Sequence, residues 1–496
     1  MKISPRLITL TRSVVCCSLV ALAAGVSADT YSGSAPGYNG PIVVEVDWQD
    51  GRIAAIRVTS HSDTPAIANP AIDTLIERVL DQQSTDIDAV SGATDTSRGL
   101  LRAIDQAVRR ADSGAAEATD SVERSTSTRH VSDGRYRGNF GDRGEAQVGV
   151  QFDVENGMLR NIRFRHLFYS GEDYLRMDAD HPLYPILQQH EQIIGHLEGS
   201  PVTSLSALWG TGDLTDDIDG FSGATIRGSK LYSAFQDALT RGVYTTAAPS
   251  EQTIGQHIDG RYRGTFSDRG EQQVSIQFDL VDNKFENLRF RHLAYGGTDY
   301  RALSSDDSLY AVLQQHEAIL NHLDGQSTDV VTELFEPGAI LPDIDGFSGA
   351  TVRANKVVSA IMNALSRSAY VPANAEDIRI EVPADGRYRG VFEDGGAQQI
   401  SIQFFLEDGV IRNPSFRHLY YAGTDYRALS EGDDLYPVKT QHDALLASLN
   451  GMPLQEVVKL HSPAELAPDV DGFSGATLRG NKVFSAIMDA LNRGLY

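Results

Sequence analysis

Most of this chain is one sequence written three times. Two strings recur every 126 residues: DGRYRG begins at Asp133, Asp259 and Asp385, and DGFSGAT begins at Asp219, Asp345 and Asp471. A long fixed period is the sequence signature of tandem structural units. The repeat therefore predicts three long modules, which we call module 2 (133–244), module 3 (259–370) and module 4 (385–496).

A shorter relative precedes these three. Residues 88–94 read DAVSGAT, and the later modules carry about 25 more residues ahead of this motif. We call residues 29–111 module 1. The small, polar segment 112–132 is typical of a flexible linker. The other two joints are short and contain proline, so the three long modules are expected to form a stiff row, each folding on its own.

The first residues have the pattern of an export signal. Three basic residues precede an apolar run over 14–26, and the small residues Val26-Ser27-Ala28 follow it. This pattern predicts a signal peptide over 1–28 and a periplasmic or otherwise extracytoplasmic protein. An uncleaved N-terminal anchor is the alternative. Cys16 and Cys17 are the only cysteines, so the exported protein would have neither disulfides nor thiolate metal sites.

The balance of charge excludes some partners. The 496 residues include 43 Lys and Arg against 67 Asp and Glu, a formal net charge of −24. Nucleic-acid binding needs clustered basic residues, so no nucleic-acid partner is expected. The content of 41% hydrophobic residues is typical of a globular protein.

Turn and periodicity signals predict the local structure. Hairpins are expected at Asp50-Gly51, Asn156-Gly157 and Asp408-Gly409, between runs rich in β-branched residues. Apolar residues at helical spacing follow over 72–80, and again after each SGAT, as over 483–491. The expected class is α+β, with four modules, each a small antiparallel sheet with packed helices. The SGAT turn opens the last helix.

The SGAT turn has the chemistry of an anion site. Its Gly and Ala let a ligand approach the backbone, and its hydroxyls stand where a helix N-terminus favours negative charge. A phosphate held near the Thr is the simplest ligand, and a plain helix cap is the alternative. The long modules add two basic residues after each Thr: Arg227 and Lys230, Arg353 and Lys356, Arg479 and Lys482.

The motif D-x-x-[ST]-G-A-[ST]-x-x-[ST] resembles the acceptor motif of the FMN-binding domain family. That family includes the C subunit of the sodium-pumping NADH:quinone oxidoreductase and the G subunit of the related Rnf complex. The resemblance implies that a flavin transferase uses FAD to esterify the phosphate of FMN to the motif's Thr. Module 1 matches throughout, and its residues are Asp88, Ser91, Gly92, Ala93, Thr94 and Ser97, with Thr94 as the acceptor.

The long modules match the motif except at its last position. The cofactor-binding residues that the resemblance implies are Asp219, Ser222, Gly223, Ala224 and Thr225; Asp345, Ser348, Gly349, Ala350 and Thr351; and Asp471, Ser474, Gly475, Ala476 and Thr477. Gly228, Ala354 and Gly480 replace the final hydroxyl residue. Up to four covalent FMN groups are therefore expected, with noncovalent FMN or a degenerate scaffold as alternatives for the long modules.

Other repeated residues allow several interpretations. Two histidines recur in each long module: His166 and His190, His292 and His316, His418 and His442. They could pack, contact a flavin ring or ligate a metal, and no metal site is assigned. The tyrosine-rich segments 169–174, 295–300 and 421–426 could stack on a flavin or form core edges.

These features together predict an exported multi-flavin electron-transfer protein. Its partners would be a membrane-bound electron donor and an extracytoplasmic acceptor, and no catalytic residue is assigned. An electron carrier is expected rather than a self-contained enzyme, because modules and linkers take up the chain. The alternatives are a periplasmic flavin-dependent reductase that acts on a terminal acceptor and a non-redox repeat scaffold.

Overall fold

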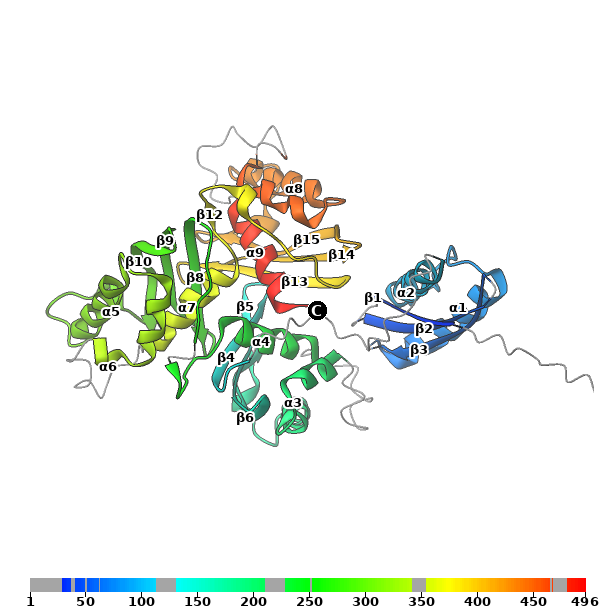
Figure 1. The fold of residues 1–496 in the computed structure, drawn as a ribbon, viewed down its shortest axis with the longest axis horizontal. Coiled ribbons are helices and arrows are strands. Elements are labelled where there is room, and N and C mark those ends of the chain that lie inside the picture. Colours follow the sequence, from blue (N-terminus) through cyan, green and yellow to red (C-terminus); the bar gives the residue numbers. More distant parts are fainter. Residues whose placement is uncertain are drawn as a thin grey trace, which may run out of the picture.

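The computed structural model describes residues 29–36, 41–49, 51–61, 63–112, 131–209, 228–249, 252–340, 354–463, 466 and 480–496. Figure 1 shows four antiparallel sheets, each packed against helices. This arrangement confirms the predicted α+β class and the repeated modules. No helix among the described residues is long and apolar enough to cross a membrane.

Module 1 is a three-stranded sheet followed by two helices. Its elements are β1 (Asp29–Pro36), β2 (Pro41–Gln49), β3 (Arg52–Ser60), α1 (Pro65–Gln82) and α2 (Thr94–Asp112). The helix α2 lies directly on β1, where a Cβ at Gly33 would stand 2.0 Å from the backbone oxygen of Ala103. Only glycine allows this approach, which closes the core around Val44, Leu75 and Ile104.

The three long modules repeat one another element by element. Module 2 has β4 (Gly134–Asp142), β5 (Glu145–Glu155), β6 (Met158–Tyr169), β7 (Glu172–Asp173), α3 (Tyr184–Leu197) and α4 (Gly228–Arg241). Module 3 has β8 (Gly260–Asp268), β9 (Glu271–Val281), β10 (Lys284–Tyr295), β11 (Thr298–Asp299), α5 (Tyr310–Leu323), α6 (Pro337–Ile340) and α7 (Ala354–Ser366), and its sheet gains β12 (Val371–Pro372). Module 4 has β13 (Gly386–Asp394), β14 (Ala397–Glu407), β15 (Val410–Tyr421), β16 (Thr424–Asp425), α8 (Tyr436–Leu449) and α9 (Gly480–Arg493). Short 3-10 helices cover Val202–Trp209, Thr328–Phe335 and Leu454–His461.

The hairpins predicted in modules 2 and 4 are confirmed. Glu155 pairs with Met158 across a two-residue loop, in which Asn156 and Gly157 have φ of 51° and 74°. Positive φ at both positions is the geometry that matches the twist of a tight hairpin. The carboxylate of Asp133 accepts a hydrogen bond from the Asn156 amide at 2.8 Å, which explains the first residue of the DGRYRG string.

Modules 2, 3 and 4 close into a ring through one ion-pair cluster used three times. In each case two arginines reach a buried aspartate at the end of the next module's first strand. Arg165 and Arg137 of module 2 reach Asp268 of module 3 at 2.5 and 3.4 Å. The equivalent contacts are Arg291 and Arg263 with Asp394 at 2.6 and 3.2 Å, and Arg417 and Arg389 with Asp142 at 2.6 and 3.6 Å. Since the last cluster joins module 4 back to module 2, the expectation of a row was wrong.

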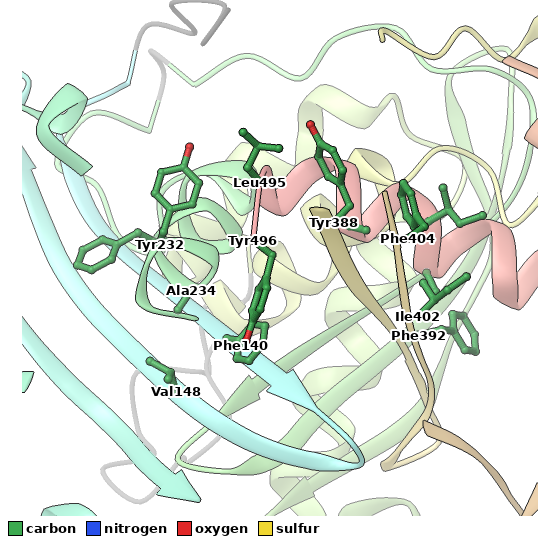
Figure 2. Packing of buried hydrophobic residues seen from close by; sticks show 14 of the residues in the cluster. Phe140, Val148, Tyr232, Ala234, Tyr388, Phe392, Ile402, Phe404, Leu495 and Tyr496 are labelled. Atoms are coloured by element: carbon green, nitrogen blue, oxygen red, sulfur yellow. The ribbon is translucent and has the colours of Figure 1, made fainter. Parts of the chain in front are cut away.

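Aromatic contacts repeat the same cycle. The final tyrosine of each long module stacks on a phenylalanine of the next: Tyr244 on Phe266, Tyr370 on Phe392 and Tyr496 on Phe140, with ring centroids 5.5, 5.6 and 5.5 Å apart. Figure 2 shows Tyr496, the last residue of the chain, beside Phe140 of β4. The guanidinium of Arg389 lies over the ring of Tyr496, 3.7 Å from its centroid. Tyr496 of module 4 thus packs against module 2 and completes the ring.

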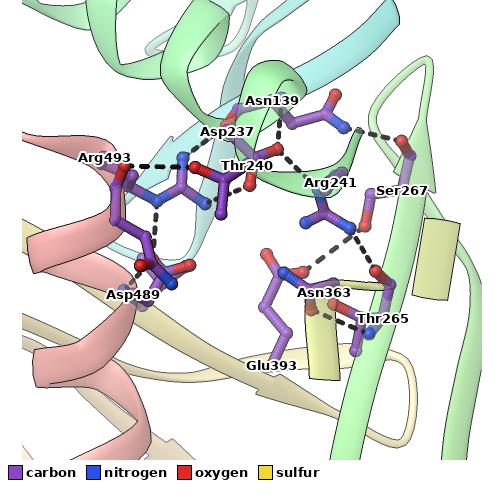
Figure 3. Close-up of polar contacts among 12 residues, drawn as sticks. Asn139, Asp237, Thr240, Arg241, Thr265, Ser267, Asn363, Glu393, Asp489 and Arg493 are labelled. Carbon is purple, nitrogen blue, oxygen red and sulfur yellow. Dashed lines mark hydrogen bonds and ion pairs between the residues drawn. The ribbon is translucent and has the colours of Figure 1, made fainter. Parts of the chain in front are cut away.

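A buried polar cluster lies where α4, α7 and α9 meet (Figure 3). Arg241 and Arg493 each pair with an aspartate one helical turn earlier, Asp237 at 2.8 Å and Asp489 at 2.6 Å. Arg493 also reaches Asp237 across the module boundary at 3.5 Å. Burial acts to raise the pKa of Asp237, but the two arginines outweigh it and hold that pKa below its usual value.

The three modules are not equivalent in this cluster. Module 3 has Asn363 where its neighbours have aspartate, so its Arg367 has no carboxylate of its own one turn earlier. Module 4 has Glu393 where modules 2 and 3 have Gly141 and Ser267. The negative charge of Glu393 favours the charged forms of Arg367 and Arg493. Three guanidiniums therefore face three carboxylates, which a buried charged cluster requires.

Candidate functional site

The SGAT turn of module 1 presents a threonine hydroxyl at the start of a long helix. Thr94 is the first residue of α2, and Ser91, Gly92 and Thr94 are exposed. Gly92 has φ of 87°, and a Cβ built on it would meet nothing within 4 Å. The space beside the turn is therefore open. An exposed hydroxyl at the positive end of a helix suits attachment of a phosphate.

Ser97 holds this turn in place. Its hydroxyl donates to the carbonyl of Ala93 at 2.7 Å and accepts from the amide of Val90 at 3.0 Å. Ser97 is fully buried, so its role is to fix the turn rather than to face a ligand. Asp88, also predicted as a site residue, is exposed ahead of the turn.

The structure adds one residue that sequence reasoning missed. Asp63, on the segment between β3 and α1, is 2% exposed and accepts a hydrogen bond from Thr96 Oγ1 at 2.6 Å. Thr96 is two residues after Thr94, so a carboxylate lies at the first turn of α2. No local pattern marks Asp63, because its partner is 33 residues away.

The corresponding turns of the long modules lie outside the described residues. This applies to every predicted site residue from Asp219 to Thr225, from Asp345 to Thr351 and from Asp471 to Thr477, and to Arg227, Arg353 and Arg479. The first described residue of α9 is Gly480, whose Cβ would stand 1.9 Å from the backbone oxygen of Leu460. A serine like Ser97 does not fit there, so the departure from the motif in module 4 has a steric cause.

The repeated lysines of the long modules are buried beside a glutamine and a tyrosine. All three lysines are only 4–5% exposed and lie on the first described turn of the last helix of their module: Lys230 on α4, Lys356 on α7 and Lys482 on α9. Their ammonium groups donate to Gln147, Gln273 and Gln399 at 2.8, 2.7 and 2.7 Å. They lie 4.6, 4.6 and 4.3 Å from the ring centroids of Tyr169, Tyr295 and Tyr421. These tyrosines therefore each have a cation against one face.

The repeated histidines lie in packing positions. His190, His316 and His442 are buried, and Nδ1 of each is 2.6 Å from a backbone carbonyl one turn earlier. His166, His292 and His418 lie against glycines of the next module in the ring, Gly270, Gly396 and Gly144. Within the part of the chain that the structure describes, no three His, Cys, Asp or Glu side chains gather as a metal site.

The geometry of module 1 agrees with a comparison to known families. Residues 37–109 match the family model of the FMN-binding domain. Module 1 is therefore an FMN-binding domain, and its matched region contains the whole SGAT turn and most of α2.

Relatives with known sequences match over stretches of similar length. One is an uncharacterised protein of Treponema pallidum (strain Nichols), 40% identical over 76 residues, which are 15% of this chain and 21% of that protein. NADH:acrylate oxidoreductase of Vibrio harveyi is 36% identical over 78 residues, 16% of this chain and 8% of that protein. Urocanate reductase of Eggerthella lenta is 34% identical over 91 residues, 18% of this chain and 15% of that protein. The chain thus spans about a fifth or less of the length of these relatives.

Proposed function

We propose that this chain is an exported electron-transfer protein that carries FMN esterified through its phosphate to Thr94. The exposed hydroxyl of Thr94, at the start of α2 inside an FMN-binding domain, is the observation that carries the proposal. Thr225, Thr351 and Thr477 are the proposed acceptors in the ring, because they stand in the same SGAT motif.

The residues of module 1 fit such a group. The open space beside Gly92 admits a bulky ligand, and the helix start offers backbone N–H groups to the phosphate. Ser97 keeps the turn fixed while its own hydroxyl is occupied. When bound, FMN supplies the one- or two-electron chemistry that the side chains lack.

The proposal includes partners and a location. A flavin transferase that uses FAD would load the threonines outside the cytoplasm after cleavage of residues 1–28. A membrane-bound donor and an extracytoplasmic acceptor would exchange electrons with the loaded protein. A flavin-dependent reductase is the second candidate, since two relatives are named as an oxidoreductase and a reductase.

The substitution Thr94→Ala tests the attachment. The variant should lose the mass of one esterified FMN and keep its fold, because only an exposed hydroxyl is removed. Thr59→Ala is the matched control, since Thr59 is also an exposed threonine of module 1. An unchanged flavin mass on the peptide that contains residue 94 would refute the proposal.

A further inference from the structure

An ion pair joins module 1 to module 4, although module 2 is the one that follows module 1 in the sequence. Nη1 of Arg102, on α2, lies 2.9 Å from Oε1 of Glu407, at the end of β14. That oxygen is shielded from water. The other carboxylate oxygen of Glu407 lies farther, at 3.7 Å, from Arg412 of its own module. Residues of β1 also approach β13, so the contact extends beyond one pair of side chains.

The sheet of module 4 differs from its two counterparts near this contact. On the first strand of each long module, one arginine points away from the core and lies opposite one residue of the second strand. In modules 2 and 3 that residue is an aspartate, and the ion pairs both measure 2.8 Å: Arg135 with Asp153, and Arg261 with Asp279. In module 4 it is Phe405, whose ring centroid lies 5.0 Å from the guanidinium of Arg387. An aromatic side chain thus replaces a carboxylate on one sheet of the ring only.

Phe405 and Glu407 lie on the same side of β14. Side chains alternate along a strand, and Phe404 and Leu406 fill the core on the other side. We call the surface formed by Arg387, Phe405 and Glu407 the module 4 face. Aromatic and arginine side chains are enriched at protein interfaces, whereas aspartate is depleted there. The replacement that distinguishes module 4 from modules 2 and 3 is therefore the kind that an interface requires.

The exposed side of α2 has the complementary charge. Arg98 and Arg102 are both exposed and lie one helical turn apart, in a chain whose formal net charge is −24. Negative charge gathers around Glu407. Burial raises the pKa of Asp385, and the charges of Asp408 and Glu407 add to that effect, so these three carboxylates lie close enough to interact. A positive helix surface therefore meets a negative hairpin.

We propose that the module 4 face is a docking site for module 1. One partly exposed ion pair is weak by itself. However, residues 112–132 tie module 1 to the ring, and a flexible connection gives an effective concentration on the order of millimolar, at which a weak contact persists. Docking is therefore reversible and sensitive to salt.

Docking leaves the acceptor hydroxyl accessible. Arg102 lies about 12 Å beyond Thr94 along the axis of α2, and Thr94 is exposed while the ion pair is formed. Module 1 can therefore be modified in its docked position. The proposal does not depend on a flavin in any module.

Carbodiimide cross-linking of the full chain tests the docking. Module 1 contains no lysine, so Arg102→Lys keeps the positive charge and places the module's one lysine ammonium at the contact. A carbodiimide joins an amine to a carboxylate only where the two touch. An amide between residue 102 and Glu407, within one chain, should be found by mass spectrometry of the peptides. Its yield should fall several-fold between about 0.01 M and about 1 M salt, because salt screens exposed charges.

Matched variants make this result specific. Arg78→Lys places a lysine at an exposed position of α1 and should give no amide to module 4. In the Arg102→Lys chain, Glu407→Gln should remove the amide, and Glu155→Gln should not, because Glu155 is the exposed equivalent in module 2. Lys439 and Asp443, an exposed pair at 2.8 Å, should be joined in every variant, which shows that the reagent has acted.

Phe405→Asp tests the module 4 face itself. It gives module 4 the residue that modules 2 and 3 have, so the sheet should keep its fold, and circular dichroism checks this. The yield of the amide should fall several-fold. Val281→Asp is the control, since Val281 is an exposed apolar residue of module 3, and the yield should stay the same.

Four results would each overturn the proposal. They are no amide at Glu407 in low salt, an equal amide yield from Arg78→Lys, an unchanged yield after Phe405→Asp, and an amide that joins two chains. The last would mean that the module 4 face binds a second copy of the protein. None of these results concerns flavin attachment, so the proposed function stands or falls separately.

Discussion

Ring closure predicts that Asp142 stabilises the protein as much as its two counterparts do. Asp142 is 3% exposed and binds Arg417 at 2.6 Å, and Ser401 donates to it at 3.0 Å. Asp142→Ala would leave Arg417 and Arg389, which are half-buried at the module boundary, without their carboxylate. Removing one partner of a buried ion pair costs about 3–5 kcal/mol. A loss of that size is expected, although these partners lie far away in the sequence.

Urea unfolding of the exported chain, monitored by circular dichroism, measures this cost. Asp268→Ala and Asp394→Ala should give similar losses, because they break the same cluster at the other two interfaces. Asp443→Ala is the control, since its exposed pair with Lys439 is worth at most about 1 kcal/mol. A stable Asp142→Ala beside two destabilised counterparts would mean a row of modules and would refute the ring.

The ion pairs of Asp142 also predict a loss of folding stability at low pH. Burial acts to raise the pKa of Asp142, but hydrogen bonds and charge from Arg417 and Arg389 hold it below its usual value. A lowered folded-state pKa gives stability that is present above about pH 4 and lost as the pH falls through that lowered value. The difference between wild type and Asp142→Ala should therefore shrink in acid.

Three further predictions concern single side chains. Ser97→Ala should lower the free energy of unfolding of module 1 by about 1–3 kcal/mol and reduce flavin loading of Thr94, because the Val90 amide loses its buried acceptor. Melting curves measure the first effect and intact mass the second, and unchanged loading would contradict the role of the turn. Tyr496→Ala should lower the free energy of unfolding in urea by about 3–5 kcal/mol, because the stacked contact with Phe140 is removed. An unchanged free energy would mean that this contact does not hold modules 4 and 2 together. His461→Phe should stabilise module 4 in acid, because burial lowers the pKa of His461 to about 4, and the stability of the histidine form falls as the pH drops from the usual histidine pKa to that value. Phe335 occupies the equivalent position in module 3, so a phenylalanine is expected to fit. An unchanged melting temperature at pH 5 would contradict this reasoning.

The sequence predicted what depends on local pattern. Hairpins at Asn156-Gly157 and Asp408-Gly409 follow from turn chemistry, and the helices follow from apolar spacing. The position of Thr94 at the start of α2 follows from the SGAT motif. These features are set by residues close together in the chain, so the local sequence is enough to predict them.

The ring could not be predicted in this way, because its contacts join distant residues. Arg417 and Asp142, for example, are 275 residues apart in the sequence. The ring arginines nevertheless lie in repeated parts of the sequence, since Arg137 belongs to DGRYRG and Arg165 precedes the repeated His166. Their repetition marked them as important but gave no direction for their side chains. Asp63 was missed for the same reason.

The central claim is covalent flavin on the SGAT threonines, and the mass of the exported protein under denaturing conditions tests it most directly. We predict a mature chain that begins after residue 28 and carries at least one FMN joined as a phosphate ester, with Thr94 among the modified residues. A chain of unmodified mass, whose flavin separates on denaturation or is absent, would contradict it.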